Sequence, residues 1–324
     1  MRDMLRKITI KKLYNLYDYN IDMGLNNGPI HFITAPNGYG KTTILEMVNA
    51  ILTSHYDDLL RIPFETVSLY FDDALELRVD QKQHFEDVDI TLDVQEKPTI
   101  ELVVRLLNHK TKKAETLGEI YVPSEPNHLM QVDDRGNIEM FLVSKTCHYL
   151  TDSRLLRKKT DMALAEQEMD SISLNIYAER LKQILNDPKL YAANISRIDT
   201  FKKIVDRSDF SSKYLEINKL FGFRFVAKDE LSTKISLNSL SSGEKHLLIQ
   251  VFELLFNAQQ GTLVLIDEPE LSFHMMWQVN YLKMIQEIAQ VRGFQYLIAT
   301  HSPHIFNNMW SLTTDLYTNS LGNE

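Results

Sequence analysis

Cysteine is almost absent from this sequence of 324 residues, in which Cys147 stands alone. A single cysteine excludes an intramolecular disulfide framework and is typical of a reducing compartment. The sequence also has no run of 18 apolar residues, and its first residues contain no apolar signal core. We therefore expect a cytoplasmic protein that does not enter a membrane.

Positive charge is scarce as well, because 35 Lys and Arg face 44 Asp and Glu, which gives a net charge of −9. This balance argues against a nucleic-acid-binding surface that covers the whole molecule. Local basic runs do occur at residues 110–113 and 154–159. Such runs are most often solvated faces, but they leave nucleic acid open as a partner.

A sustained heptad repeat is missing, which excludes a long coiled coil. The hydrophobic content of 44% and the charged content of 24% are ordinary for a globular protein with a substantial core. The chain also lacks internal repeats and low-complexity linkers. We therefore expect one composite unit over residues 1–324, with lobes inside it.

A glycine-rich loop occupies residues 35–42 (APNGYGKT), directly after the short apolar stretch 29–34, which predicts a buried strand. The loop follows the phosphate-binding pattern G-x-x-x-x-G-K-[ST], except that Ala35 replaces the first glycine. Helical spacing over 43–52 places the expected phosphates at a helix N-terminus, where the helix dipole favours anions. The alternative for this loop by itself is a plain glycine-rich turn with an exposed lysine.

Each residue type in this loop suits one part of a bound nucleotide. Glycines let backbone amides approach the phosphates, lysine supplies a positive charge, and a threonine hydroxyl can ligate Mg²⁺. We therefore expect ATP and Mg²⁺ as cofactors, with Thr42 as a metal ligand. The expected nucleotide-binding residues of the loop are Asn37, Gly38, Tyr39, Gly40, Lys41, Thr42 and Thr43.

A second motif, LSSGEK, occupies residues 240–245 and precedes a helical pattern that runs to Asn257. The hydroxyl of Ser241 and the backbone amide at Gly243 would then lie at the positive end of a helix. The competing interpretation is a simple serine cap with Glu244 in the first helical turn, which is a common arrangement.

Two further motifs follow predicted buried strands. The strand at 262–266 ends in Asp267 and Glu268, which could hold the Mg²⁺ shell and polarise an attacking water, respectively. The strand at 294–299 leads to His301, which we expect to contact the γ-phosphate. We predict Glu268, His301 and Lys41 as the catalytic residues. An acidic turn and a structural histidine are the alternatives.

Together, these motifs resemble those of ABC-type ATPases of the OLD (overcoming lysogenization defect) and SMC-like clan, over residues 1 to about 310. The resemblance implies an α/β fold, namely an ABC-type P-loop NTPase head of the SMC or RecF kind with a mixed central sheet. It further implies that Ser241 and Gly243 complete the ATP site of a second copy. The same resemblance leads us to expect that residues 271–274 contact that copy.

The spacing of apolar residues predicts two lobes within this head. Alternation between residues 67 and 107 predicts an antiparallel β lobe at 66–150, with a further strand at 141–150. Helical spacing over 161–221 predicts a helical lobe at 151–222.

Some positions depart from the family or have no settled role. Relatives usually carry a glutamine where Ser153 stands, so the role of this loop is open, as is the role of Arg154. Tyrosines near the first strand are candidates to stack on adenine, although packing is the commoner use. They are Tyr14, Tyr17 and Tyr19.

The resemblance also implies a function. We expect an ATPase that closes as a head-to-tail dimer around ATP and regulates a separate effector, a nuclease or toxin. ATPase subunits of antiphage systems such as PARIS or Septu are similar, which favours a defence role. The chain stops soon after His301, so we expect any nuclease on another polypeptide. One alternative is a DNA-binding repair protein of the RecF type, and another is a scaffold with little turnover. A third is a transporter subunit, which the sequences DEPE (267–270) and SGE (242–244) disfavour.

Overall fold

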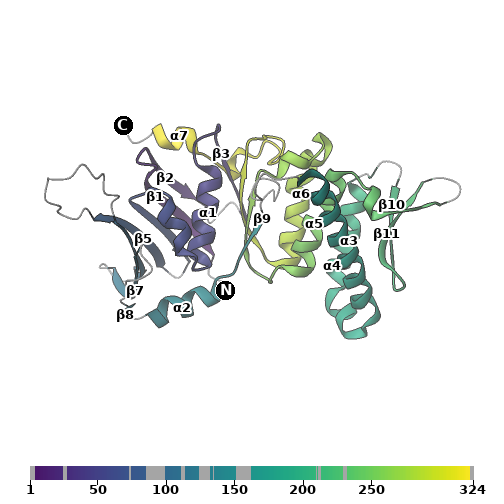
Figure 1. The fold of residues 1–324 in the computed structure, drawn as a ribbon, viewed down its shortest axis with the longest axis horizontal. Coiled ribbons are helices and arrows are strands. Elements are labelled where there is room, and N and C mark those ends of the chain that lie inside the picture. Colours follow the sequence, from purple (N-terminus) through teal and green to yellow (C-terminus); the bar gives the residue numbers. More distant parts are fainter. Residues whose placement is uncertain are drawn as a thin grey trace.

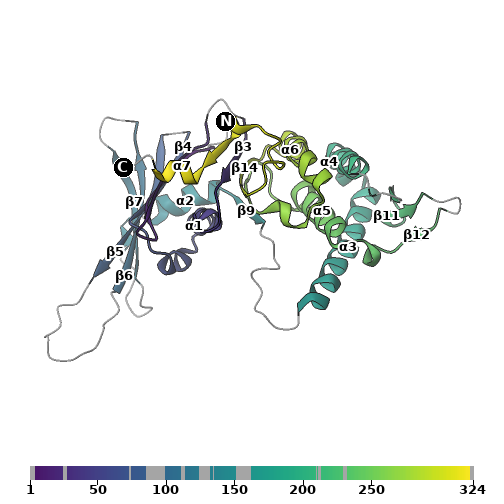
Figure 2. The ribbon, with the colours of Figure 1, turned by 90° about the horizontal axis from the view of Figure 1, so that it is seen from above.

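The computed structural model describes residues 4–24, 28–72, 74–84, 99–110, 114–123, 132–133, 135–150, 162–208, 210, 213–228 and 232–321. The molecule is elongated, with an antiparallel sheet at one end, a parallel sheet in the middle and a helical lobe at the other end (Figure 1). The same three parts are seen from above in Figure 2. The nucleotide motifs all belong to the middle part or border it.

A five-stranded parallel sheet forms this middle part, in the order β15-β3-β14-β13-β9. Its strands are β3 (Ile30–Thr34), β9 (Cys147–Leu150), β13 (Leu263–Asp267), β14 (Gln295–Thr300) and β15 (Thr313–Asp315). Leu263 and Leu265 of β13 enter one hydrophobic cluster, whereas Val264 and Ile266 enter another on the opposite face. Parallel sheets are covered on both faces, which explains why this strand is apolar throughout. The expected strands before the P-loop, before the acid pair (Asp267 and Glu268) and before the switch histidine (His301) are thus confirmed.

The antiparallel sheet has seven strands in the order β2-β1-β4-β5-β6-β7-β8. They are β1 (Leu5–Leu13), β2 (Tyr17–Asp22), β4 (Thr66–Phe71), β5 (Leu75–His84), β6 (Thr99–Asn108), β7 (Glu115–Pro123) and β8 (Val132–Asp133). The predicted β lobe at 66–150 therefore also includes the two N-terminal strands. Its last part differs from the prediction, because α2 (Arg135–Ser144) is a helix and β9 joins the parallel sheet. The α/β class is confirmed, with the two strand arrangements divided between two sheets.

Helix α1 (Lys41–Leu52) lies between the two sheets and starts directly after the P-loop. Nine of its twelve residues are buried, and its apolar side chains share one hydrophobic cluster with residues from both sheets. This burial fixes the position of the helix, and therefore also the position of the loop at its N-terminus. The short 3₁₀ helix η1 (Tyr56–Arg61) follows.

The other face of the parallel sheet carries the helical lobe. Its helices are α3 (Met162–Asn186), α4 (Pro188–Arg207), α5 (Ser242–Phe252) and α6 (Met275–Arg292), with a small sheet of β10 (Lys213–Asn218), β11 (Gly222–Ala227) and β12 (Lys234–Ile235). Phe201 of α4 and Phe252 of α5 pack edge to face with ring centroids 6.0 Å apart, and Tyr177 of α3 stacks on Phe252 at 4.5 Å. These aromatic contacts join the expected helical lobe to the helix that carries the second motif.

The remaining short elements complete the fold around the strand ends. They are the 3₁₀ helices η2 (Leu237–Ser239), η4 (Pro269–Ser272) and η5 (Trp310–Leu312), the π-helical turn η3 (Glu253–Asn257) and helix α7 (Leu316–Leu321). Within the part of the chain that the structure describes, no helix has the length and apolar character needed to cross a membrane.

Candidate nucleotide-binding site

The P-loop connects β3 to α1 and relies on two glycines in the left-handed region. Gly38 has φ 90° and Gly40 has φ 79°, a region that glycine enters at little cost. A Cβ atom on Gly40 would also lie 2.9 Å from Cδ2 of Leu13. Ala35 is not among the residues with positive φ, so alanine is accommodated at the place of the first glycine. Its carbonyl oxygen accepts a hydrogen bond from the Lys41 ammonium at 3.0 Å.

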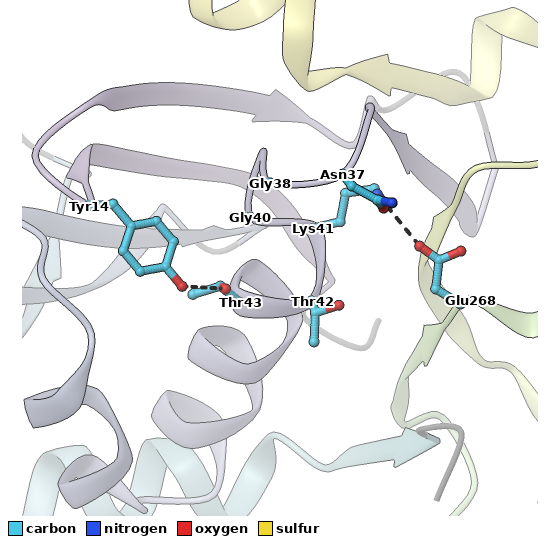
Figure 3. Close-up of a pocket in the computed structure, with 8 residues that line it drawn as sticks. All are labelled: Tyr14, Asn37, Gly38, Gly40, Lys41, Thr42, Thr43 and Glu268. Atoms are coloured by element: carbon cyan, nitrogen blue, oxygen red, sulfur yellow. Dashed lines mark hydrogen bonds and ion pairs between the residues drawn. The ribbon is translucent and has the colours of Figure 1, made fainter. Parts of the chain in front are cut away.

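A cavity of about 400 Å³ opens in front of this loop (Figure 3). Most of the predicted loop residues line it, together with two side chains from elsewhere. The lining residues are Tyr14, Asn37, Gly38, Gly40, Lys41, Thr42, Thr43 and Glu268. Helix α1 has no side-chain cap at Gly40, so its first amides remain available to an anion. The predicted loop residues are therefore brought together, with the exception of the Tyr39 side chain.

The three predicted catalytic side chains meet at the edge of this cavity. The Nζ atom of Lys41 lies 2.6 Å from Nε2 of His301 and 3.5 Å from Oε1 of Glu268. The same Nε2 atom lies 2.9 Å from that Oε1 atom. Lys41 is buried, and burial lowers its pKa while the Glu268 charge opposes this shift. Burial and the Lys41 charge also lower the pKa of His301.

Glu268 owes its orientation to an unusual backbone conformation. Directly after β13 the chain turns into the left-handed region, with φ 45° at Glu268, and its amide donates to the carbonyl oxygen of Ala299 at 2.9 Å. Non-glycine residues rarely adopt such angles, and functional sites are where they concentrate. Burial, and then the neighbouring Glu270 carboxyl, raise the pKa of Glu268 to about 8. This carboxyl therefore exchanges its proton close to neutral pH.

The two predicted metal ligands lie next to each other. The hydroxyl of Thr42 donates a hydrogen bond to Oδ2 of Asp267 at 2.8 Å. Among the described residues, no group of three or more His, Cys, Asp or Glu could hold a metal ion by itself. Mg²⁺ in nucleotide sites is typically held by one or two protein oxygens together with phosphate oxygens. Thr42 and Asp267 fit that donor set.

Ser241 and Gly243 lie at the start of α5 and do not line the described cavity. Ser241 forms a capping box: its Oγ accepts from the amide of Glu244 at 3.3 Å, and its own amide donates to the Glu244 carboxylate at 2.7 Å. Lys213 holds Glu244 from the other side at 2.6 Å. The capping interpretation is thus confirmed. Ser241 itself is exposed to solvent, so a role towards a second copy stays a prediction.

The aromatic residues near the loop divide into two groups. Tyr14 lines the cavity, and its hydroxyl lies 2.8 Å from Oγ1 of Thr43. Tyr39 instead packs against Tyr17 and Tyr317, with ring centroids 5.4 Å and 5.5 Å apart. The hydroxyl of Tyr19 donates to the Tyr39 carbonyl oxygen at 2.8 Å. Of the three tyrosines considered for stacking, only Tyr14 therefore lines the described cavity.

Several predicted positions lie elsewhere. Ser153 and Arg154 fall outside the described residues, as does the whole basic run at 154–159. Phe273, within the stretch expected to contact a partner, is buried in the protein's own core. The sequence analysis gave no role to Glu270, whose carboxylate contacts the loop that carries His301 (the switch loop, residues 299–302). Its position two residues after the acid pair was the available signal.

Comparisons with known proteins agree with this geometry. Residues 150–307 match a family described as "AAA domain, putative AbiEii toxin, Type IV TA system". This range contains the second motif, the acid pair and the switch histidine. The chain is also 25% identical over 341 residues to the OLD nuclease of Thermus scotoductus, covering 93% of this chain. It spans 59% of the length of that curated relative.

Two solved structures are similar in outline. One is an SMC head bound to the C-terminal winged-helix domain of ScpA, with a TM-score of 0.48, 13% identity and coverage of 94% of this chain and 91% of that one. The other is the SMC head domain from Thermotoga maritima, with a TM-score of 0.44, 12% identity and coverage of 97% and 92%. This chain, whose P-loop, acid pair and His301 meet at one cavity, is thus similar to an AAA-domain family over residues 150–307 and to an OLD nuclease over most of its own length.

Proposed function

We propose that this protein binds ATP with Mg²⁺ and hydrolyses it to ADP and phosphate. The single observation that carries the proposal is the convergence of Lys41, Glu268 and His301 beside the phosphate-binding loop. A buried cation, a carboxyl and a histidine lie within 3.5 Å of one another here, an arrangement suited to a shared chemical role. Phosphoryl transfer to water uses such a set.

Each residue has a distinct part in this reaction. MgATP, when bound, supplies the phosphoryl group and the metal charge that favours its transfer. Lys41 and the amides of the loop bind phosphate oxygens, and Thr42 and Asp267 hold the metal. Glu268, whose carboxylate lies beside Lys41 and His301, accepts a proton from the attacking water. His301 donates a hydrogen bond to the terminal phosphate.

The proposal includes a head-to-tail dimer in which Ser241 and Gly243 complete the site of the other copy. Ser241 is exposed at the N-terminus of α5, where it could reach a second molecule. Large apolar side chains are also exposed just after the acid pair: Leu271 by 57%, Met275 by 59% and Met276 by 62%. Exposed apolar groups that gather in one place favour a surface that a partner covers.

We further propose that this dimer regulates a separate effector, a nuclease or toxin, in antiphage defence. This step rests on analogy with the OLD relative and with the matched family, not on the chemistry of a residue. An effector retained by the hydrolysis-deficient protein during purification would support it. Retention of nucleic acid alone would favour the DNA-repair alternative.

Replacement of Glu268 tests the hydrolysis step. We expect Glu268→Gln to lower kcat by about 10² to 10³-fold, because a positioned base contributes on that order. The Kd for MgATP should stay within about threefold, since Lys41 and the loop are intact. The matched control Glu179→Gln, an exposed carboxylate on α3, should behave as wild type.

Turnover and binding together separate the alternatives. If the wild type binds MgATP but turns over no faster than Glu268→Gln, the protein is a nucleotide-dependent scaffold and the hydrolysis proposal is wrong.

A further inference from the structure

Glu270 occupies the 3₁₀ turn η4, two residues beyond the proposed base. We propose that it is a positioning residue, whose carboxylate holds the main chain of the switch loop (residues 299–302) so that the His301 ring faces Lys41 and Glu268. The inference rests on the proposed ATP hydrolysis and assigns a new role within that same site. Glu270 itself neither lines the described cavity nor contacts the place of the phosphates.

One oxygen of Glu270 gathers three donors from the switch loop. Its Oε1 atom accepts from Oγ1 of Thr300 at 2.7 Å, from the amide of His301 at 2.6 Å and from the amide of Ser302 at 3.1 Å. Hydrogen bonds to a carboxylate are roughly twice as strong as neutral ones. Thr300 is fully buried; its hydroxyl accepts from the Ser302 amide at 3.0 Å, and without Glu270 it would lose the acceptor for its own proton.

A second link holds the same loop from helix α6. The side-chain Nε2 of Gln278 donates to the main-chain carbonyl oxygens of Phe273 at 3.0 Å and Glu270 at 3.4 Å. Its side-chain Oε1 accepts from the Ser302 hydroxyl at 2.8 Å. The side chains of Glu270 and Gln278 thus join the loop after β13 to the loop after β14. The hydrogen bond from the Glu268 amide to Ala299 adds a third connection.

These links matter because the two reacting side chains come from different strands. Glu268 follows β13 and His301 follows β14, and loops after strand ends move more than the strands do. The 2.9 Å separation between Glu268 Oε1 and His301 Nε2 therefore depends on how the two loops are joined. A displacement of about 1 Å in such a site can cost on the order of 10²-fold in rate.

Glu270→Ala and Glu270→Gln test the assignment. Alanine removes the acceptor, whereas glutamine removes the charge but keeps an oxygen where Oε1 stands. We expect alanine to lower kcat by about 10 to 100-fold with the Kd for a fluorescent ATP analogue within about threefold. Glutamine should retain kcat within about fivefold of wild type, because its oxygen can still accept the three bonds.

Chemical modification gives a readout that is independent of turnover. Diethyl pyrocarbonate modifies unprotonated histidine, and the exposed His304 provides an internal reference three residues away. We expect the ratio of modification at His301 to that at His304 to rise several-fold in Glu270→Ala and to stay within twofold in Glu270→Gln. Glu287→Ala is the matched control. Glu287 is also a part-buried carboxylate, but it lies on α6 and binds Arg207 rather than the switch loop.

The outcomes are distinct. The positioning role is overturned if glutamine is as damaging as alanine, if alanine keeps the wild-type kcat, or if Kd rises by as large a factor as kcat falls. It is also overturned if the His301 ratio is unchanged in Glu270→Ala, or rises equally in Glu287→Ala. Absence of ATP turnover in the wild type would instead defeat the proposed function, while the modification ratio would still decide the role of Glu270.

Discussion

At the scale of single residues, the P-loop conformation depends on glycine at position 40. Gly40→Ala would place a Cβ at φ +79° and 2.9 Å from a Leu13 methyl group. We expect a loss of about 1 to 2 kcal/mol in the free energy of unfolding and at least a tenfold weaker Kd for MgATP. Thermal unfolding and calorimetric titration measure the two effects.

Gly28→Ala is the matched control for this substitution. Gly28 has the same φ of +79°, but its added Cβ would have no neighbour within 4 Å. It should show the backbone cost alone and bind MgATP as the wild type does. Equal binding by Gly40→Ala and Gly28→Ala would contradict the role given to the loop.

Single residues that a motif reports could be named from the sequence, whereas contacts that depend on packing could not. Motifs indicated Lys41, Asp267 and Glu268, and the structure brings them together because the carboxyl ends of parallel strands share one edge of a sheet. The contact between Gly40 and Leu13 joins positions far apart in sequence, which a local pattern does not report. The role of Glu270 was hidden for the same reason, since its donors lie 30 to 32 residues away.

At the scale of elements, strand β3 carries a buried histidine that should make stability depend on pH. His31 is 2% exposed, and burial lowers its pKa to about 4, with the Asp22 charge opposing the shift. The unfolded chain takes up a proton near pH 6.5, whereas the folded protein resists protonation down to about 4. Stability from this group is therefore complete above the unfolded pKa and is lost as pH falls towards the folded one.

His31→Gln removes this titration while an amide can still meet the Thr314 hydroxyl, now 2.9 Å from Nε2 of His31. Between pH 7 and pH 5 the wild type should lose about 2 kcal/mol more unfolding free energy than the variant. Denaturant titrations at the two pH values measure this difference. Parallel losses in both proteins would show that His31 is not responsible.

Elements were predictable to the extent that their apolar spacing was distinctive. The buried strands of the parallel sheet and the helices of the helical lobe were found from their patterns. Helix α2 was instead predicted in part as a strand, because residues 141–143 are apolar in succession. Its buried residues Ile138, Phe141 and Leu142 have helical spacing, which the shorter window missed.

At the scale of the whole molecule, two hydrophobic clusters cover the two faces of the parallel sheet. The α/β class and the order of the lobes followed from the sequence. The pairing of β1 with β4 did not, because the entire P-loop helix lies between these two strands in the sequence. Local sequence patterns likewise do not report the surface on which a second copy would dock. The shared ATP site therefore stays a proposal.

The central claim is that each ATP site is shared between two copies, and mixing two inactive variants tests it most directly. Lys41→Ala removes the phosphate-binding cation, and Ser241→Arg blocks the exposed end of α5. In a mixed dimer, one site would combine an intact loop with an intact Ser241. Thermal unfolding of each variant checks that both fold.

Each variant alone should be inactive, and an equal mixture should recover about a quarter of the wild-type rate, because half the dimers are mixed and each has one of two sites intact. Recovery at that level would establish a site completed in trans. An equal mixture that stays as inactive as either variant, although both are folded and exchange subunits, would contradict the account.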